Sequence, residues 1–308
     1  MNDHHTQFNF RFILAIIILS SSMLAINVSY SKDQPNRSLP KHKAVPGGIA
    51  ILPLDTESVS LPIVYFNNKR ILVIKYNNIS SQHNNNHNSW LAILGIPMNT
   101  PPGLHKVSIF LDQKDQNNFT KNIEKTFMVA KPKYPTERLK LSPKLVSPSL
   151  ADQLRINKEN ELIRNAYNYW SHQIPNLTLQ QPIIGRKSSP FGLNRILNGM
   201  HKGFHSGLDL AAPAGTKIYA SASGKVILTG NFFYTGHSIF IDHGQGLITS
   251  YSHLDTINVA EGDLVDAQTI VGTVGSTGRS TGPHLHWAVS LNDARVNPEL
   301  FSTVTSGS

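Results

Sequence analysis

The chain has 308 residues, with 28 Lys and Arg against 19 Asp and Glu and therefore a formal net charge of +9. It contains 14 His and no Cys. The absence of Cys excludes a disulfide scaffold, a thiolate metal site and a cysteine nucleophile, so any metal site must use His, Asp or Glu. The length suggests about two domains. The 40% content of hydrophobic residues excludes wholesale disorder.

The N-terminus carries an apolar segment that predicts export. Residues 12–28 are predominantly apolar and follow Arg11, and Ser29-Tyr30-Ser31 offers small residues at cleavage-determining positions. We therefore expect residues 1–31 to be a signal peptide, which places the protein in the periplasm or cell envelope. The apolar run also approaches the length of about 17 residues that spans a bilayer, so an uncleaved inner-membrane anchor is the alternative.

The first half of the chain has the pattern of short strands. After a polar linker at residues 32–45, β-branched and aromatic runs separated by Asn, Gly and Pro predict a small all-β domain over residues 46–132. An Asn-rich stretch at residues 80–89 is expected to be a solvated loop. The strands are expected at residues 49–54, 61–66, 70–76, 90–96, 104–111 and 125–130.

The second half combines a helix with further strands. Residues 133–182 are expected to form a linker and a helix, which runs from Leu150 to Trp170 behind Ser149 as its N-cap. Residues 183–303 again alternate strands with glycine-rich turns, which is typical of antiparallel β structure. The expected strands there are residues 217–222, 225–229, 238–242, 247–252, 270–274 and 285–290.

Histidines of this last segment form a suggestive pattern. Side chains alternate between the two faces of a strand, so His284 and His286 project to the same side. His205 and Asp209 add an imidazole and a carboxylate. Three nitrogen or oxygen ligands with one open position are the usual composition of a catalytic zinc site. Three other histidines are expected to lie at the surface or in turns: His201, His237 and His243.

These residues lie in motifs that resemble the LytM/lysostaphin-type zinc metallopeptidases, which cut peptide bonds in peptidoglycan. Over about residues 188–301 the quoted motifs include SSPFG, HSGLDLAAPAGTKIYASASGKV, IDHGQGLITSYSHL and GSTGRSTGPHLHWAV. A looser resemblance links VPGGIAILPL to the N-terminal β domain of envelope peptidases. The resemblance implies that His205, Asp209 and His286 hold one Zn²⁺ in the catalytic domain. It also implies that His253 and His284 are the catalytic pair that does not bind the metal.

The family resemblance implies that the site lies in a groove, and the chain departs from the family pattern near it. Asn194 stands where relatives often have Arg, which leaves Arg195 alone, and Phe204 stands where many relatives have Pro. We expect these positions to flank the groove rather than the metal. Substrate contacts are expected at Asn194, Arg195 and Arg279. Three glycines of the GSTGRSTG motif are expected in turns with positive φ: Gly275, Gly278 and Gly282.

The sequence thus predicts a mainly β protein: a small N-terminal β domain, a linking helix and a C-terminal antiparallel β metallopeptidase domain of the lysostaphin type. The resemblance implies a zinc endopeptidase that hydrolyses peptidoglycan cross-links for cell-wall remodelling. The D-Ala–meso-diaminopimelate bond is the expected target, ahead of a pentaglycine bridge. The alternative is a catalytically inactive protein of the same fold that binds peptidoglycan or activates an amidase.

Peptidoglycan stem peptides and cross-links are the expected partners, with an envelope protein as a further one. Contact with a membrane is expected only through residues 1–31, if these are not cleaved. Residues 181–308 hold equal numbers of basic and acidic residues, so the basic excess lies upstream and suits attachment to an anionic envelope polymer. Nucleic acid is not expected, because basic and aromatic residues do not interleave.

Overall fold

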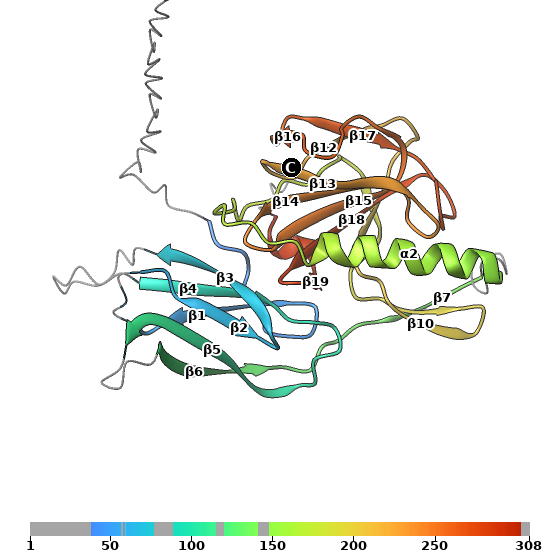
Figure 1. Cartoon of the computed structure of the whole chain (residues 1–308). Helices are drawn as coiled ribbons and strands as arrows, with labels where there is room; N and C mark the ends of the chain where they lie inside the picture. Colours follow the sequence, from blue (N-terminus) through green and yellow to red (C-terminus); the bar gives the residue numbers. More distant parts are fainter. Residues whose placement is uncertain are drawn as a thin grey trace, which may run out of the picture. The chain divides into compact units, whose positions relative to one another are not determined.

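The computed structural model of the chain describes residues 38–56, 58, 60–76, 89–114, 120–140 and 148–302. Within these ranges the protein is mainly β with one α-helix, as the sequence predicts (Figure 1). The expected export segment at residues 1–31 and nearly all of the Asn-rich stretch lie outside the described residues. No helix in the described ranges is long and apolar enough to cross a membrane.

The N-terminal part forms one six-stranded antiparallel sheet with the order β1-β4-β3-β2-β5-β6. Its strands alternate as half-buried strands do: in β2, Ile63 and Tyr65 are exposed whereas Val64 and Phe66 are buried. Some of the buried side chains form a core of their own. The others pack into the core of the C-terminal part: Ile49, Leu72, Ile74, Leu91 and Ile93. The strands are β1 (Ile49–Leu54), β2 (Ile63–Phe66), β3 (Lys69–Tyr76), β4 (Ser89–Gly95), β5 (Gly103–Lys114) and β6 (Thr120–Val129).

The C-terminal part is built on a ten-stranded sheet whose main path is β16-β13-β14-β15-β18-β11-β8. Tyr251 and Trp287 are fully buried in its core, so both are packing residues. The strands on the main path are β8 (Arg186–Ser189), β11 (Leu208–Ala211), β13 (Gly224–Phe232), β14 (Gly236–Gly244), β15 (Leu247–Ile257), β16 (Leu264–Val265) and β18 (His284–Leu291). Attached to them are β12 (Lys217–Tyr219), β17 (Ile270–Val274), β19 (Ala294–Val296) and the 3-10 helix η1 (Pro298–Leu300).

A separate three-stranded sheet has the order β10-β9-β7. Strands β9 (Asn194–Leu197) and β10 (Met200–Phe204) form a hairpin. Strand β7 (Thr136–Leu139) pairs in parallel with β9, although it lies in residues 133–182, which we expected to contain only linker and helix. A four-residue TERL run has no apolar alternation, so the strand has no signature in the sequence.

Helix α2 (Leu150–Tyr167) ends three residues before the expected Trp170. Ser149 caps its N-terminus, where the hydroxyl accepts a hydrogen bond from the N–H of Asp152 at 3.2 Å. The helix lies along the large sheet (Figure 1), and Tyr167 packs edge-on against Phe240 of β14.

Two buried amides of the C-terminal part bind the backbone of the N-terminal sheet. Gln245 Oε1 accepts a hydrogen bond from the N–H of Val73 at 3.0 Å. Asn292 Oδ1 accepts from the N–H of Gly95 at 2.7 Å, and its Nδ2 donates to the carbonyl of Gly95 at 3.1 Å. Both amides sit in turns with positive φ and are buried. These bonds join the two sheets through main-chain atoms.

The expectation that His243 lies at the surface or in a turn is wrong. His243 is 1% exposed and lies on β14, where its Nδ1 is 2.8 Å from the carbonyl of Ser223 and its Nε2 is 2.7 Å from Thr249 Oγ1. Burial lowers its pKa to about 4. His243 is therefore a neutral core residue held by hydrogen bonds.

Candidate metal centre

Pairing of strands β11 and β18 brings the first candidate residues together. In the antiparallel register Asp209 lies opposite His286, and Ala211 lies opposite His284. His284 and His286 project to the same face of β18, because side chains alternate along a strand. His205 follows directly on β10, and its N–H donates to the carbonyl of Leu193 at 2.8 Å.

The atoms of a metal-ligand set converge on one point. His205 Nε2 lies 2.9 Å from Asp209 Oδ1 and 3.1 Å from His286 Nδ1. The distance between His286 Nδ1 and Asp209 Oδ1 is 2.7 Å. Two imidazole nitrogens and one carboxylate oxygen are the donor chemistry of a catalytic zinc site. These three residues can therefore hold a metal ion together.

Surrounding groups orient two of these side chains, His205 and Asp209. His205 Nδ1–H donates to the carbonyl of Pro190 at 2.8 Å, which leaves the lone pair of its Nε2 facing the cluster. Arg195 Nη2 lies 3.0 Å from Asp209 Oδ2 and 3.0 Å from Ser189 Oγ. The expectation that Arg195 flanks the groove rather than the metal is therefore wrong. Its guanidinium holds one oxygen of Asp209 and leaves the other oxygen to the cluster.

Gly207 explains the small residue in the HSG motif. A Cβ built on Gly207 would lie 2.7 Å from His286 Nε2 and 2.7 Å from the carbonyl oxygen of Trp287. Only a residue without a side chain lets the chain before β11 pass so close to the His286 ring.

Burial governs the protonation of the cluster. Burial alone would raise the pKa of Asp209, but hydrogen bonds and opposite charge from His205 and His286 outweigh it and hold the pKa well below its usual range. Burial lowers the pKa of His286, although Asp209 opposes this effect. The cluster thus offers an ionised carboxylate, which is the form that binds metal.

Two further histidines complete the site. The ring centroids of His253 and His284 are 4.8 Å apart, and His284 Nε2 lies 3.9 Å from Asp209 Oδ1. His253 Nδ1 lies 2.7 Å from the carbonyl of Thr277, and His284 Nδ1 lies 2.8 Å from the carbonyl of Gly282. Each Nδ1–H therefore donates to a carbonyl, which leaves Nε2 as the nitrogen available to other partners.

The backbone of His253 takes an uncommon conformation. Its φ is +63°, in the left-handed region that residues with a Cβ rarely adopt. Burial, and then the neighbouring His286 and His284, lower the pKa of His253 to about 3. The ring is therefore neutral near pH 7.

The expected substrate contacts lie in two places. Asn194 is on β9, where its N–H donates to the carbonyl of Pro135 and its side chain to Thr136 Oγ1, so it fixes the segment around β7. Arg279 lies in the loop between β17 and β18, with its guanidinium 4.4 Å from the ring centroid of Tyr234. The exposed Phe204 packs against the ring of Tyr134.

The glycines of the GSTGRSTG motif follow the expectation only in part. Gly278 has a φ of +70°, as predicted. Gly275 and Gly282 do not have positive φ. At Gly275 close packing is the reason for the small residue, because a Cβ would lie 2.4 Å from the backbone nitrogen of Asp255.

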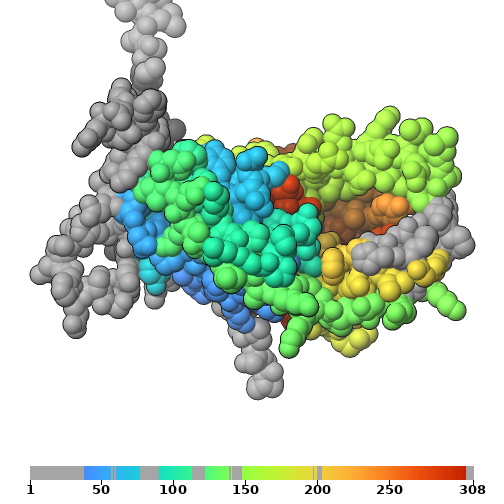
Figure 2. Space-filling model, turned by 90° about the horizontal axis from the view of Figure 1, so that it is seen from below, coloured from blue at the N-terminus to red at the C-terminus, as the bar shows by residue number. Residues whose placement is uncertain are grey.

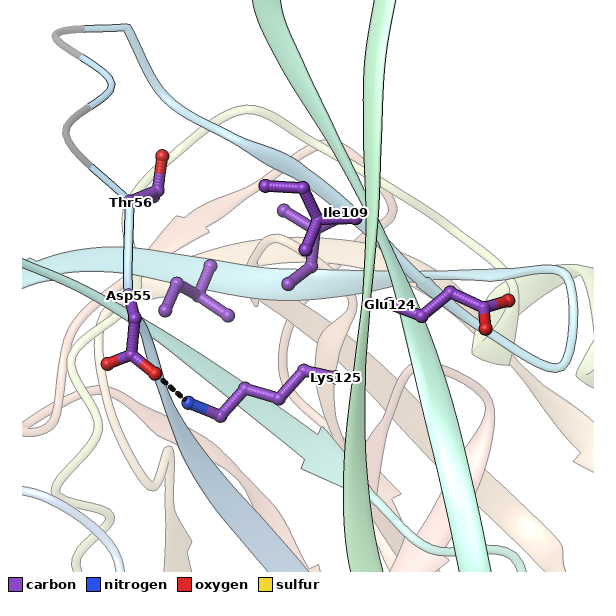
Figure 3. Close-up of a pocket in the computed structure, with 7 residues that line it drawn as sticks. Asp55, Thr56, Ile109, Glu124 and Lys125 are labelled. Carbon is purple, nitrogen blue, oxygen red and sulfur yellow. Dashed lines mark hydrogen bonds and ion pairs between the residues drawn. The ribbon is translucent and has the colours of Figure 1, made fainter.

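Figure 2 shows the surface hollowed between helix α2 and the hairpin that contains β10, with orange residues of the large sheet at its floor. A different pocket lies in the N-terminal sheet (Figure 3). There, Lys125 Nζ pairs with Asp55 at 2.6 Å beside the apolar side chains of Ile109 and Ile123. The candidate metal ligands are not part of that pocket.

Comparison with known proteins identifies both halves of the chain. Residues 42–122 match the N-terminal domain of peptidase family M23, and residues 203–298 match peptidase family M23 itself. A solved structure of a putative M23 peptidase from Pseudomonas aeruginosa is 38% identical, with a TM-score of 0.66. The similarity covers 84% of this chain and 95% of that one. The chain belongs to peptidase family M23. This finding confirms the resemblance and the mainly β fold that the sequence predicts.

Curated relatives of this M23 chain include named cell-wall enzymes. The DD-carboxypeptidase/endopeptidase Mpg of Neisseria meningitidis is 44% identical over 121 residues, which are 38% of this chain and 27% of Mpg. The peptidoglycan DD-endopeptidase ShyA of Vibrio cholerae is 42% identical over 93 residues, or 30% of this chain and 22% of ShyA. An uncharacterized metalloprotease of Buchnera aphidicola is 42% identical over 120 residues, 38% of this chain and 32% of that protein. The matches thus span about a quarter to a third of these relatives.

Sequence reasoning did not single out several residues around this M23 site. Pro190 and Ser189 orient His205 and Arg195, and Thr277 holds His253. Their motifs, SSPFG and GSTGRSTG, were visible in the sequence. The contacts themselves come from loops that the fold brings together, so residue type alone could not reveal them.

Proposed function

We propose that this chain is a zinc-dependent endopeptidase that hydrolyses peptide cross-links of peptidoglycan during cell-wall remodelling. The observation that carries the proposal is the convergence of His205, Asp209 and His286, with the two free imidazole nitrogens of His253 and His284 beside them. Family M23 and the peptidoglycan endopeptidases among its curated relatives support it. The D-Ala–meso-diaminopimelate bond is the proposed target.

The three ligand residues fit a single Zn²⁺. Their donor set is two imidazole nitrogens and one carboxylate oxygen. Pro190 holds the other nitrogen of His205, and Arg195 holds the other oxygen of Asp209. A zinc ion bound there would supply Lewis-acid chemistry, because it polarises a peptide carbonyl and lowers the pKa of a water molecule.

His253 and His284 then move the protons. Each ring is fixed by a carbonyl at Nδ1, so its Nε2 can accept a proton from water and later donate it to the leaving amine. When its own Nε2 carries a proton, the second ring can donate a hydrogen bond to the oxygen that gains negative charge.

The other regions receive roles that accompany this proposal. Residues 1–31 would direct export to the periplasm or anchor the chain in the inner membrane. Residues 46–132 would be an attachment domain and residues 183–303 the catalytic domain, with peptidoglycan and an envelope protein as partners. Residues 133–182 would connect them.

Digestion of purified sacculi by the full chain, followed by mass spectrometry of the released fragments, tests the function. Loss of D-Ala–meso-diaminopimelate dimers is the expected result. His253→Ala should abolish this loss while zinc stays bound, and Asp209→Ala should lose the metal itself in elemental analysis. If neither these dimers nor glycine-bridged species disappear, the chain is not a cross-link endopeptidase. Binding to sacculi without cleavage would then favour the inactive alternative.

A further inference from the structure

Arg279 is a half-buried cation whose position is fixed on both sides. Its backbone N–H donates to the carbonyl of Tyr234 at 2.7 Å, and its guanidinium stacks over the Tyr234 ring at 4.4 Å from the centroid. Neighbouring Gly278 packs against the same turn, where a Cβ would lie 2.3 Å from the nitrogen of Gly236. The guanidinium is thus held in place before any ligand arrives.

The loop that carries Arg279 also contacts both proposed catalytic histidines. Two residues before Arg279, the carbonyl of Thr277 accepts the Nδ1–H of His253 at 2.7 Å. One residue after it, Ser280 Oγ lies 3.2 Å from His284 Nδ1. Arg279 therefore stands at the edge of the reacting centre.

Arg279 has no carboxylate partner among the described residues. The charged or ionisable groups that act on it are Tyr234 and Arg195, and the charge of Arg195 disfavours its own. Arg195 differs, because it pairs with Asp209 at 3.0 Å and with Glu137 at 3.3 Å. A partly desolvated cation gains most from a buried anionic partner, and a guanidinium suits a carboxylate with two parallel hydrogen bonds.

We propose that Arg279 binds a free carboxylate of the substrate, on the carbon that bears the leaving amine. This inference rests on the proposed endopeptidase function. It names the chemical group beside the scissile bond that the site recognises. In a D-Ala–meso-diaminopimelate cross-link that carbon carries a free carboxylate, whereas a glycine–glycine bond inside a pentaglycine bridge has only another peptide group there. Arg279 thus selects cross-links whose amine component is an amino-acid centre with an unblocked carboxyl group.

Two synthetic cross-linked peptides test the proposal with the zinc-loaded full chain. They are identical except that the carbon bearing the leaving amine carries a carboxylate in one and a carboxamide in the other. For the unaltered chain, kcat/KM should be about 10- to 100-fold higher with the carboxylate. Arg279→Met should lose this factor on the carboxylate peptide and change little on the carboxamide. Arg279→Lys should keep part of this preference, because lysine retains the positive charge but lacks the two parallel N–H donors of a guanidinium.

Arg295 provides a matched control. Its guanidinium also stacks over a tyrosine, at 4.0 Å from the centroid of Tyr167, but it pairs with Asp293. It lies on β19, which pairs with the end of β18 away from His284 and His286. Arg295→Met should leave the ratio between the two peptides unchanged. Equal ratios for the Arg279→Met and Arg295→Met variants would overturn the proposal.

A binding measurement separates this inference from the proposed function. Zinc-loaded His253→Ala should bind the carboxylate peptide more tightly than the carboxamide, and the added Arg279→Met should remove the difference. Equal Kd values for the two peptides would overturn the role of Arg279 even if the unaltered chain cleaves both. Cleavage of neither peptide, with the Kd preference kept, would overturn the endopeptidase function and support the carboxylate site.

Discussion

Arg195 donates a hydrogen bond to Asp209, with Nη2 3.0 Å from Oδ2. The other oxygen of the same carboxylate, Oδ1, lies within 2.9 Å of nitrogens of both His205 and His286. One oxygen of the Asp209 carboxylate thus binds a cation that fixes the side chain, and the other oxygen faces the two histidine ligands. Arg195 reaches it from β9, and Glu137 of β7 holds the same guanidinium at 3.3 Å.

The first prediction concerns this guanidinium. Arg195→Met should weaken zinc affinity by about 10- to 100-fold, the usual cost of losing a group that orients a metal ligand. Competition with a chelator of known affinity measures it. Arg186→Met, on the exposed face of β8, is the control and should leave zinc affinity unchanged. Unaltered affinity in the Arg195 variant would show that Asp209 keeps its orientation without help.

A second prediction uses the close contact at Gly207. Gly207→Ala places a Cβ 2.7 Å from the His286 ring, so it should cost about 1–3 kcal/mol of unfolding free energy and reduce zinc content. Gly282→Ala is the matched control, because a Cβ there meets no atom within 4 Å. Denaturant unfolding and elemental analysis of both variants would check this. Equal stability and zinc content in the two would contradict the steric argument.

The third prediction separates positioning from metal binding. Thr277 Oγ1 donates to the carbonyl of Leu254 at 2.8 Å, and the Thr277 carbonyl holds His253. Thr277→Val should lower kcat about tenfold, part of the roughly 100- to 10,000-fold that a positioned acid or base supplies. Zinc content should not change. Thr277→Ser keeps the hydroxyl and should restore kcat; failure of serine to do so would exclude the hydroxyl as the cause.

A fourth prediction follows from the buried His243. Its pKa is 6.5 in the unfolded chain and about 4 in the fold. Between these values the unfolded chain binds more protons, so the unfolding free energy falls as the pH falls and is fully regained above about pH 6.5. The difference amounts to about 3 kcal/mol. His243→Gln should flatten the stability profile between pH 6.5 and 4, measured by denaturant unfolding. An unchanged slope would assign the dependence to other groups.

How far the sequence predicts this protein depends on the length of each signal. The apolar run of β3 was predicted within one residue of its observed ends. Strand β15 was predicted from its correct first residue, but it continues five residues beyond the expected end at residue 252. The H-x-H spacing alone predicts that His284 and His286 share one face of a strand. By contrast, β7 to β10 are short and polar, and they are strands only because they find partners elsewhere in the chain.

The same limit applies to single residues. Arg195 was visible as a charge near a motif, but its contact with Asp209 depends on how the β9–β10 hairpin lies against β11. His243 was expected at the surface or in a turn. It is neutral and buried because Ser223 and Thr249, from other parts of the sheet, supply its hydrogen bonds.

The hydrogen bonds of Gln245 and Asn292 to the N-terminal sheet constrain the two amides more than they constrain β3. Both amides bind the main chain of β3 and β4, at Val73 and Gly95, and not the side chains there. Gly95 must stay small, because a Cβ would lie 2.6 Å from the carbonyl oxygen of Leu291. Val73 can be replaced by other residues that pack in its core, because its bond to Gln245 is made by the backbone N–H. Homologues should therefore preserve the two amides while β3 varies opposite them.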